Sequence, residues 1–279
     1  MKLGANTYAF LWSETLENSI KIMGENGYKA IEFLVSPPHF ILSDYKPGAY
    51  KGLKHIMDDY GMKTLCLNIP SLDINIASPY AQMRKMTFDL YKRLTDICME
   101  LDAEIMLICP GKRHPLLPQP FDKCFDWARQ SICDVVDYTK DTDLTIALET
   151  VPAGFMDTVA DLKKLRDSVN SDRVKIVFDV TNVFMTEDQP EKKIHLIKDN
   201  ICLMHLSDTT RKRWEHAPIG CGCVDSMAFI REAESVGYDG YLSLEIINDK
   251  GIKGLNDSVR SLISMGWQPD NMSEGGWSI

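Results

Sequence analysis

The 279-residue sequence lacks both a long apolar run and an excess of basic residues. No stretch approaches the roughly 20 consecutive apolar residues that a membrane-spanning helix needs. Lys and Arg together number 31 against 40 Asp and Glu, which gives a formal charge of −9. Because an acidic surplus repels phosphate backbones, it argues against nucleic acid as a partner. We therefore expect a soluble, cytoplasmic protein that binds neither membranes nor nucleic acid.

A C-x-x-C pair is also absent, although the sequence contains eight cysteines. Most of them lie in apolar stretches, where a free cysteine behaves as a small hydrophobic residue. Cys221-Gly222-Cys223 is too tightly spaced for a usual zinc knuckle, and we interpret it as a loop feature. The cysteines therefore indicate core thiols and no zinc knuckle.

No linker rich in Pro, Gly or Ser divides the chain, and amphipathic helical stretches alternate with short apolar runs. Eight such runs have the length and composition of buried strands: 3–8, 30–35, 63–68, 104–109, 144–149, 174–179, 201–205 and 241–246. This alternation predicts an α/β fold, a (β/α)8 TIM barrel. A doubly wound open sheet is the main alternative, but the first run is not followed by a Gly-rich turn.

We expect one barrel domain over residues 1–279, with a C-terminal extension from about residue 267 to 279. Trp267 and Trp277 lie in this stretch. Exposed tryptophans there would suggest a contact between subunits.

Four consecutive predicted strands end on ionisable residues, which are Glu149, Asp179, His205 and Glu245. Such groups beside buried apolar runs cost free energy unless they are paired or bound to metal. The carboxyl ends of barrel strands meet at one mouth, so these side chains should converge. Each alone could be a helix cap or an ion-pair partner. Together, three carboxylates and an imidazole favour a divalent cation, which would reduce their formal charge from −3 to −1.

The motifs around these residues resemble the xylose-isomerase-like TIM-barrel superfamily of sugar isomerases, ketose 3-epimerases and metal-dependent apurinic endonucleases. They are Leu148-Glu149, the segments 178–182, 204–208 and 216–225, and Leu244-Glu245. The resemblance implies that Glu149, Asp179, His205 and Glu245 hold one divalent metal ion. Mn²⁺ is favoured, with Mg²⁺, Co²⁺ or Zn²⁺ as alternatives.

The same resemblance implies that Glu149 and Glu245 are the catalytic acid–base pair of a metal-dependent isomerase. The preferred reaction is 3-epimerisation of a ketose or substituted ketose through an enediolate. Aldose–ketose isomerisation and a keto-inositol-type dehydration use similar chemistry and stay open as alternatives. Members of the superfamily are commonly dimers or tetramers, so we expect a homodimer or homotetramer in carbohydrate metabolism.

Asn182 departs from the family pattern, which often has a histidine three residues after the strand-six aspartate. An amide is a poor metal ligand, and this departure, with the shortage of histidines, disfavours an apurinic endonuclease-like phosphodiesterase. The segments 37–39 and 109–114 are similar to those of fructosamine-type 3-epimerases, which also lack that histidine.

Several further polar residues follow predicted strands and are candidates for contact with a small-molecule sugar. Arg211 resembles the family's arginine that clamps a substrate oxygen, although the basic run around it could equally be a solvated loop. We detect no phosphate-binding loop after the last two strands, which favours an unphosphorylated or sugar-amine substrate. The candidate substrate-binding residues are Arg211, Asn182, His216, Glu32, His39 and His114.

Overall fold

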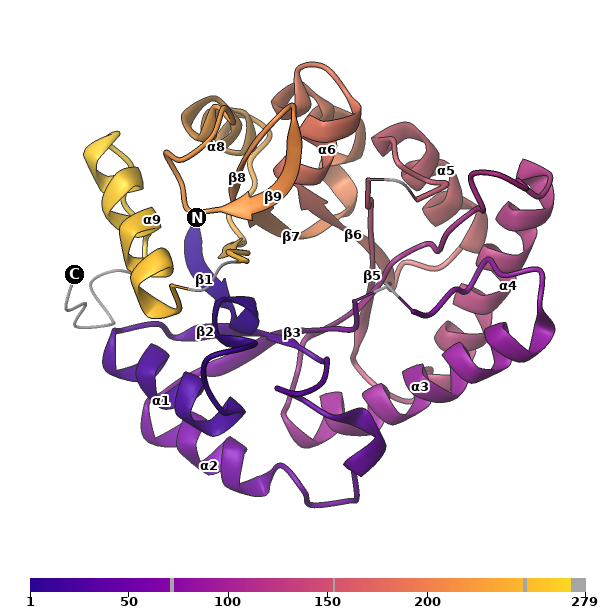
Figure 1. The fold of residues 1–279 in the computed structure, drawn as a ribbon, viewed down its shortest axis with the longest axis horizontal. Helices are drawn as coiled ribbons and strands as arrows, with labels where there is room; N and C mark the ends of the chain where they lie inside the picture. The colour runs from indigo at the N-terminus through magenta and orange to yellow at the C-terminus, as the bar shows by residue number, and fades with distance from the viewer. Residues whose placement is uncertain (71–72, 153, 248–249, 272–279) are drawn as a thin grey trace.

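Eight parallel strands close into a barrel in a computed structural model that describes residues 1–70, 73–152, 154–247 and 250–271 (Figure 1). Around the barrel the order is β1-β10-β7-β6-β5-β4-β3-β2. The strands are β1 (Lys2–Asn6), β2 (Ala30–Leu34), β3 (Lys63–Asn68), β4 (Ile105–Ile108), β5 (Thr145–Glu149), β6 (Val174–Asp179), β7 (Ile201–Leu206) and β10 (Tyr241–Leu244). The predicted (β/α)8 barrel is confirmed.

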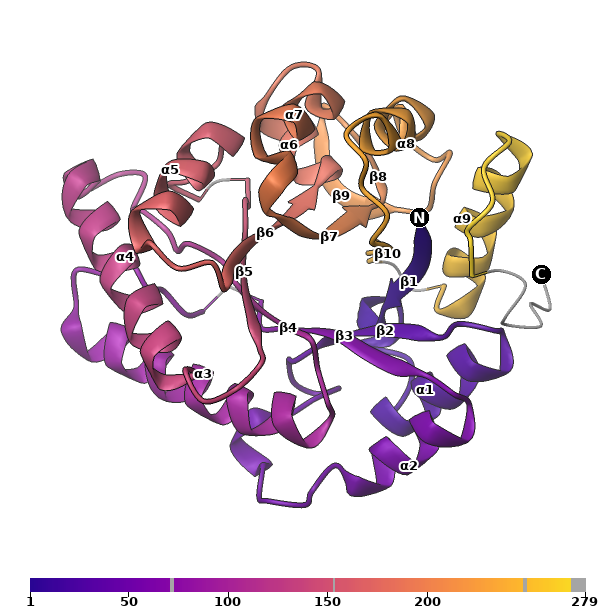
Figure 2. The same cartoon turned by 180° about the vertical axis from the view of Figure 1, so that it is seen from behind.

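Helices surround the barrel in both views of the molecule (Figures 1 and 2). They are α1 (Leu16–Glu25), α2 (Lys51–Asp59), α3 (Ala81–Glu100), α4 (Phe121–Tyr138), α5 (Val159–Val169), α6 (Val180–Thr186), α7 (Ile194–Ile197), α8 (Ser226–Ser235) and α9 (Ile252–Ser264). Short 3-10 segments are η1 (Thr7–Phe10), η2 (Leu42–Asp44), η3 (Pro190–Lys193) and η4 (Lys198–Asn200). No helix in the described part of the chain is long and apolar enough to cross a membrane.

The period-2 alternation of the strands explains why polar groups reach the barrel mouth. A small cluster of strand residues, among them Ala147, Val177 and Leu203, fills the barrel interior, while their strand neighbours pack outward in the larger core. Side chains two residues further along each strand point the same way. Glu149, Asp179 and His205 therefore continue the inward-facing rows of Ala147, Val177 and Leu203.

A two-stranded antiparallel hairpin follows β7 and was not expected from the sequence. It consists of β8 (Asp208–Thr210) and β9 (Arg213–Ala217), with Asp208 paired to Ala217 and Thr210 to Arg213. The strands are short and polar, so they lack the apolar alternation by which a strand is usually predicted. The hairpin places residues 213–217 beside the barrel mouth.

The described part of the predicted C-terminal extension packs against the barrel. The expectation of an exposed tryptophan in this stretch is wrong for Trp267. Trp267 is only 6% exposed, because it belongs to the hydrophobic core. The Asn271 side chain accepts from the Leu3 N–H and donates to the Leu3 carbonyl, while Asp270 pairs with the N-terminal amine at 2.6 Å. Residues 272–279, including Trp277, lie outside the described residues, so a subunit contact there stays a prediction.

Candidate metal centre and active site

The four strand-end residues converge at the barrel mouth. Glu149, Asp179, His205 and Glu245 are all buried, and each offers one ligand atom within 4.8 Å of the others. His205 Nδ1 lies 3.0 Å from Glu149 Oε1, 3.3 Å from Glu245 Oε2 and 3.9 Å from Asp179 Oδ2. The convergence that the strand pattern predicts is therefore present in the structure.

Asp179 performs two tasks with its two carboxylate oxygens. Oδ1 caps α6 by accepting from the N–H groups of Thr181 and Asn182, at 2.7 and 3.0 Å. Oδ2 is fully buried and has no hydrogen-bond partner, although buried polar atoms nearly always have one. The helix-cap and metal-ligand interpretations of this residue are thus compatible, and the orphaned oxygen faces the cluster.

Glu32 lies behind His205 and does not border the cavity at the barrel mouth. Its Oε2 is 2.9 Å from His205 Nε2 and accepts from Ser243 Oγ at 3.1 Å. His205 Nε2 makes no aligned hydrogen bond, but a carboxylate at ion-pair distance favours a proton on this outer nitrogen and so leaves the inner nitrogen free to bind metal. Glu32, which the sequence predicts as a substrate contact, is placed where it orients His205.

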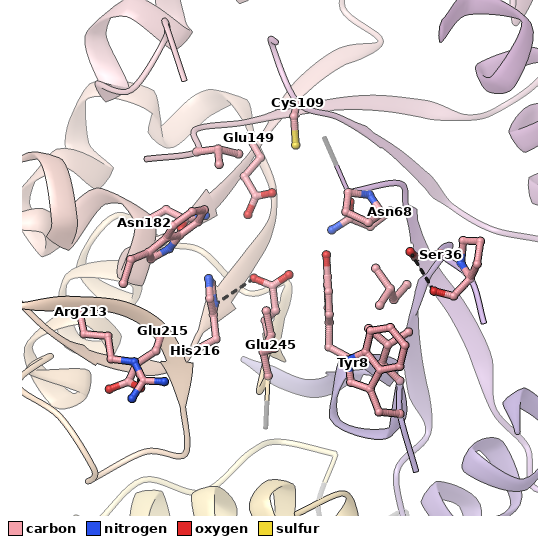
Figure 3. A pocket seen from close by; sticks show the side chains of 18 residues that line it. Tyr8, Ser36, Asn68, Cys109, Glu149, Asn182, Arg213, Glu215, His216 and Glu245 are labelled. Atoms are coloured by element: carbon pink, nitrogen blue, oxygen red, sulfur yellow. Dashed lines mark hydrogen bonds and ion pairs between the residues drawn. The ribbon is translucent and has the colours of Figure 1, made fainter. Parts of the chain in front are cut away.

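His216 joins the cluster from β9. Its Nδ1 lies 3.3 Å from Glu245 Oε2 and 2.9 Å from Ser207 Oγ (Figure 3). The Ser207 hydroxyl donates to Thr181 Oγ1, so it accepts from the His216 ring. Burial lowers the pKa of His216, which keeps its imidazole neutral. The ring is therefore fixed as a neutral group beside Glu245.

Burial strongly perturbs the titration of the cluster. It raises the pKa of Glu149 to about 7 and that of Asp179 to about 6, and it also raises the pKa of Glu245. Burial alone would lower the pKa of His205, but the carboxylates of Glu32, Glu245 and Glu149 outweigh it and raise that pKa well above 6.5. The raised pKa values of the carboxylates and of His205 have one cause: several negative charges are packed together out of water. Such a cluster is stabilised by binding either protons or a cation.

The donor set fits a divalent metal ion. Three carboxylate oxygens and one imidazole nitrogen suit an ion between hard and soft, such as Mn²⁺ or Zn²⁺. Three features agree with such an ion: the unpartnered Asp179 Oδ2, the contact of His205 with Glu32, and the close spacing of the ligand atoms. Its identity stays a prediction.

A cavity of about 600 Å³ opens above the cluster. Glu149, Glu245 and His216 lie at its inner end, whereas Asp179 and His205 are buried beneath it. Figure 3 shows Asn182, Arg213 and His216 along one wall, with Tyr8 and Asn68 on the opposite wall. The two glutamates thus reach both the cluster and the space where a substrate fits.

Besides Glu32, three of the predicted substrate contacts do not border this cavity. Arg211 donates to the carbonyls of Phe184 and Glu187 and covers the Phe184 ring. His114 is exposed and accepts from two N–H groups of its own loop. His39 is buried against the carbonyl of Glu14, at 3.3 Å, beside a separate hollow. Arg213, on the other side of the hairpin turn, borders the cavity in place of Arg211.

Asn182 does border the cavity, but its amide is already used by the protein. Its Nδ2 donates to the Thr150 carbonyl at 3.1 Å, and its Oδ1 accepts from Trp214 Nε1 at 2.9 Å. Trp214, on β9, was missed because the hairpin was missed. Asn182 therefore holds Trp214, and a direct contact of Asn182 with substrate stays a prediction.

Asp208 is a second residue that the sequence reasoning missed, although it lies in one of the quoted motifs. Its buried carboxylate accepts from the N–H groups of Thr209, Gly220, Gly222 and Val224, at 2.8 to 3.0 Å. A Cβ on Gly222 would lie 2.3 Å from the Thr209 carbonyl oxygen, which explains the glycine at this close approach. Asp208 thereby fixes the loop that follows the His216 strand.

Comparisons with known proteins agree with this architecture. A fructoselysine 3-epimerase of Escherichia coli O157:H7 is 20% identical over 239 residues, covering 83% of this chain and 86% of that protein. The crystal structure of a D-tagatose 3-epimerase-like protein has a TM-score of 0.82 at 23% identity, covering 95% of this chain and 99% of the other. The IOLI protein with a zinc atom has a TM-score of 0.82 at 18% identity, covering 96% and 100%.

The structural similarities establish the fold, and the sequence establishes the family. The family model of the xylose isomerase-like TIM barrel matches residues 20–265, which is most of the chain. This chain belongs to the xylose isomerase-like TIM barrel family.

Proposed function

We propose that this protein is a divalent-metal-dependent sugar isomerase or epimerase, whose preferred reaction is 3-epimerisation of a ketose or substituted ketose. One observation carries the proposal: Glu149 and Glu245 belong both to the buried ligand cluster and to the cavity lining. Two carboxylates at one cation site can therefore face a substrate from different strands. The similarity to a fructoselysine 3-epimerase and to a D-tagatose 3-epimerase-like structure supports the same reaction class.

The chemistry follows from the two glutamates. A divalent cation held by the four cluster residues would polarise a ketose carbonyl and so acidify the adjacent C3–H bond. One glutamate carboxylate removes the C3 proton, and the C–H electron pair enters the C2–C3 bond to give an enediolate. The other glutamate, as a carboxylic acid, returns a proton to C3 from the opposite face. Configuration is inverted without net oxidation, and positioned acid–base groups contribute about 10²–10⁴-fold to such a rate.

His216 is a positioning residue for Glu245 in this scheme. Its neutral ring lies between Ser207 Oγ and Glu245 Oε2, and its contact with Ser207 fixes the ring against β7. A fixed ring beside Oε2 restricts the rotation of the Glu245 carboxylate. Catalytic groups must be held near their productive geometry, because small displacements cost large factors in rate.

The structure gives the endonuclease alternative no support. Within the described residues, the four-residue cluster is the only group of three or more side chains suited to a metal ion. Arg213 is the only lysine or arginine among the described cavity-lining residues, and it pairs with Glu215 at 3.4 Å. A site for a DNA phosphodiester is expected to offer more positive charge.

The proposal is tested by product analysis on a panel of ketopentoses and ketohexoses. Purified protein loaded with Mn²⁺ should convert at least one ketose to its C3 epimer, detected by chromatography, and metal-depleted protein should not. An aldose product would select isomerisation within the proposed class. Loss of water from a keto-inositol, with no epimer from any ketose, would favour the dehydratase alternative. If Mn²⁺-loaded protein converts none of these ketoses to an epimer or an aldose, the proposal is contradicted.

A further inference from the structure

The cavity extends well beyond the carboxylates at its inner end. Its volume of about 600 Å³ lies within the range of about 300–1,000 Å³ that buries drug-sized ligands. Glu149, Glu245 and His216 are nearly inaccessible, whereas Trp12 is 82% and Trp214 42% exposed. Most of the remaining lining is apolar: Leu11, Trp12, Leu34, Pro37, Pro70, Val151, Trp214 and Ile247. A substrate whose reacting carbon lies at the glutamates therefore has room for a further group toward the rim.

Trp214 forms a fixed aromatic surface on one wall. Its Nε1 donates to Asn182 Oδ1, and Asn182 is itself anchored to the Thr150 carbonyl. The centre of the indole lies 6.3 Å from that of the His216 ring. The orientation of the indole is thus set before any ligand binds, and a preorganised ring avoids the entropy cost of ordering on binding.

Trp12 supplies a second exposed ring. It follows η1, which carries Tyr8 on the wall opposite His216 (Figure 3). The indole borders the cavity on one side and the separate hollow beside His39 on the other. Such an exposed apolar group next to a concave site is typical of a binding surface.

The charges at the rim do not favour an anionic further group. Arg213 and Glu215 lie on the same wall, and Arg213 Nε is 3.4 Å from Glu215 Oε2 (Figure 3). They neutralise each other, and no lysine is among the described residues that line the cavity. A phosphate or carboxylate substituent would find no unpaired cation there, whereas a neutral ring would lie beside two exposed indoles.

We propose that the substrate is a ketose bearing a neutral ring substituent, either an aryl group or a second sugar, that packs on Trp214 and Trp12. The ketose part rests on the proposed function, while the ring-binding part rests on the rim alone. Stacking on aromatic faces is the chemistry that both kinds of ring share. An aromatic pair contributes about 0.5–1.5 kcal/mol beyond the area buried, so a ring gives a gain of up to about 10-fold in affinity.

The test compares the binding of four ketoses to metal-depleted protein by calorimetry, where no turnover occurs. The ligands are D-fructose, 1-O-benzyl-D-fructose, 6-O-benzyl-D-fructose and the disaccharide 6-O-α-D-glucosyl-D-fructose. At least one ring-bearing ketose should bind about 2- to 10-fold more tightly than D-fructose. Tighter binding of only the benzyl ethers identifies an aryl substituent, and tighter binding of the disaccharide identifies a second sugar.

Variants locate the effect at the rim. Trp214→Ala and Trp12→Ala should each reduce the affinity ratio between the ring-bearing ketose and D-fructose. Asn182→Ala, which leaves the indole in place but unanchored, should also reduce it. The matched control is Tyr80→Ala, because Tyr80 is an aromatic residue outside the cavity whose exposure lies between those of Trp12 and Trp214, and it should leave the ratio unchanged.

The outcomes separate this inference from the proposed function. Equal affinity for all four ketoses overturns the ring-binding inference, even where Mn²⁺-loaded protein epimerises D-fructose. A ring preference that the tryptophan variants remove supports the inference even where no ketose is epimerised. The absence of epimerisation would count against the proposed function alone. A ring preference that survives in Trp214→Ala and Trp12→Ala also overturns the inference.

Discussion

Replacing Asp179 with asparagine separates the two tasks of this residue. An asparagine side chain still caps α6, because its carbonyl oxygen can accept from the N–H groups of Thr181 and Asn182. The substitution removes the charge on the orphaned Oδ2 that faces the cluster. We therefore expect Asp179→Asn to fold, to lose most of its metal affinity, and to be at least as stable as the metal-free wild-type protein. The last effect arises because a buried, uncompensated negative charge is removed.

The magnitude follows from linkage between metal binding and folding. Metal at 100 times its dissociation constant stabilises the folded state by about 2.7 kcal/mol. The entropy of unfolding is about 2.1 cal/mol/K per residue, or about 0.6 kcal/mol/K for this chain length. Mn²⁺ should therefore raise the melting temperature of the wild-type protein by about 5 °C and that of Asp179→Asn by about 1 °C or less. Differential scanning calorimetry at pH 7.5 with and without Mn²⁺ measures both shifts.

The matched control is Asp208→Asn, because Asp208 is also buried but its oxygens are fully satisfied by four backbone N–H groups. An asparagine would place its NH₂ group, a donor, against backbone N–H donors, which lowers the stability of the fold by about 1–3 kcal/mol. This variant should melt at a lower temperature and still gain about 5 °C from Mn²⁺. A full metal response in Asp179→Asn, or none in the wild-type protein, would refute the ligand assignment.

Four further predictions concern the same site. Glu245→Gln should reduce turnover to background while metal, measured by elemental analysis, is partly retained; unchanged turnover would remove Glu245 from the acid–base pair. Metal affinity should fall as the pH decreases below 7, because protons compete at Glu149, with a pKa of about 7, and at Asp179, with a pKa of about 6. Metal-free protein should show the opposite trend and lose stability as the pH rises from about 4.5 to 7, since carboxylates with raised pKa values stabilise the fold only while protonated; a thermal scan with no such trend would contradict the burial argument. Glu32→Gln should weaken metal binding by about 10–100-fold, as is usual when the outer partner of a ligating histidine changes, and an unaltered affinity would show that the contact with His205 is dispensable.

The barrel and its ligand cluster could be predicted because both follow from local patterns. Each predicted strand was short, apolar and separated by a helical stretch, and the carboxyl ends of parallel barrel strands necessarily meet at one mouth. Period-2 alternation then aims Glu149, Asp179 and His205 inward, as the register of Asp179 beside His205 shows. These three ligand candidates, and Glu245 directly after β10, needed no information about packing.

The residues that line the cavity were harder to predict because they depend on contacts between distant segments. Arg211 and Arg213 are two residues apart, and only the unforeseen hairpin decides which of them borders the cavity. The amide of Asn182 is occupied by Trp214, 32 residues further along the chain. Glu32 lies in the middle of β2, not at a strand end, and its position behind His205 follows from the closure of the barrel.

The exchange of solvent deuterium at C3 tests most directly whether the two glutamates transfer a proton at a metal-bound ketose. Mn²⁺-loaded protein is incubated in D₂O with the ketose that shows the greatest turnover, and the C3 position of recovered substrate and product is followed by NMR. The account predicts deuterium at C3 of the epimer, dependent on Mn²⁺ and lost in Glu149→Gln and Glu245→Gln. Epimer formed without deuterium at C3, or exchange that is undiminished in both variants, would contradict it.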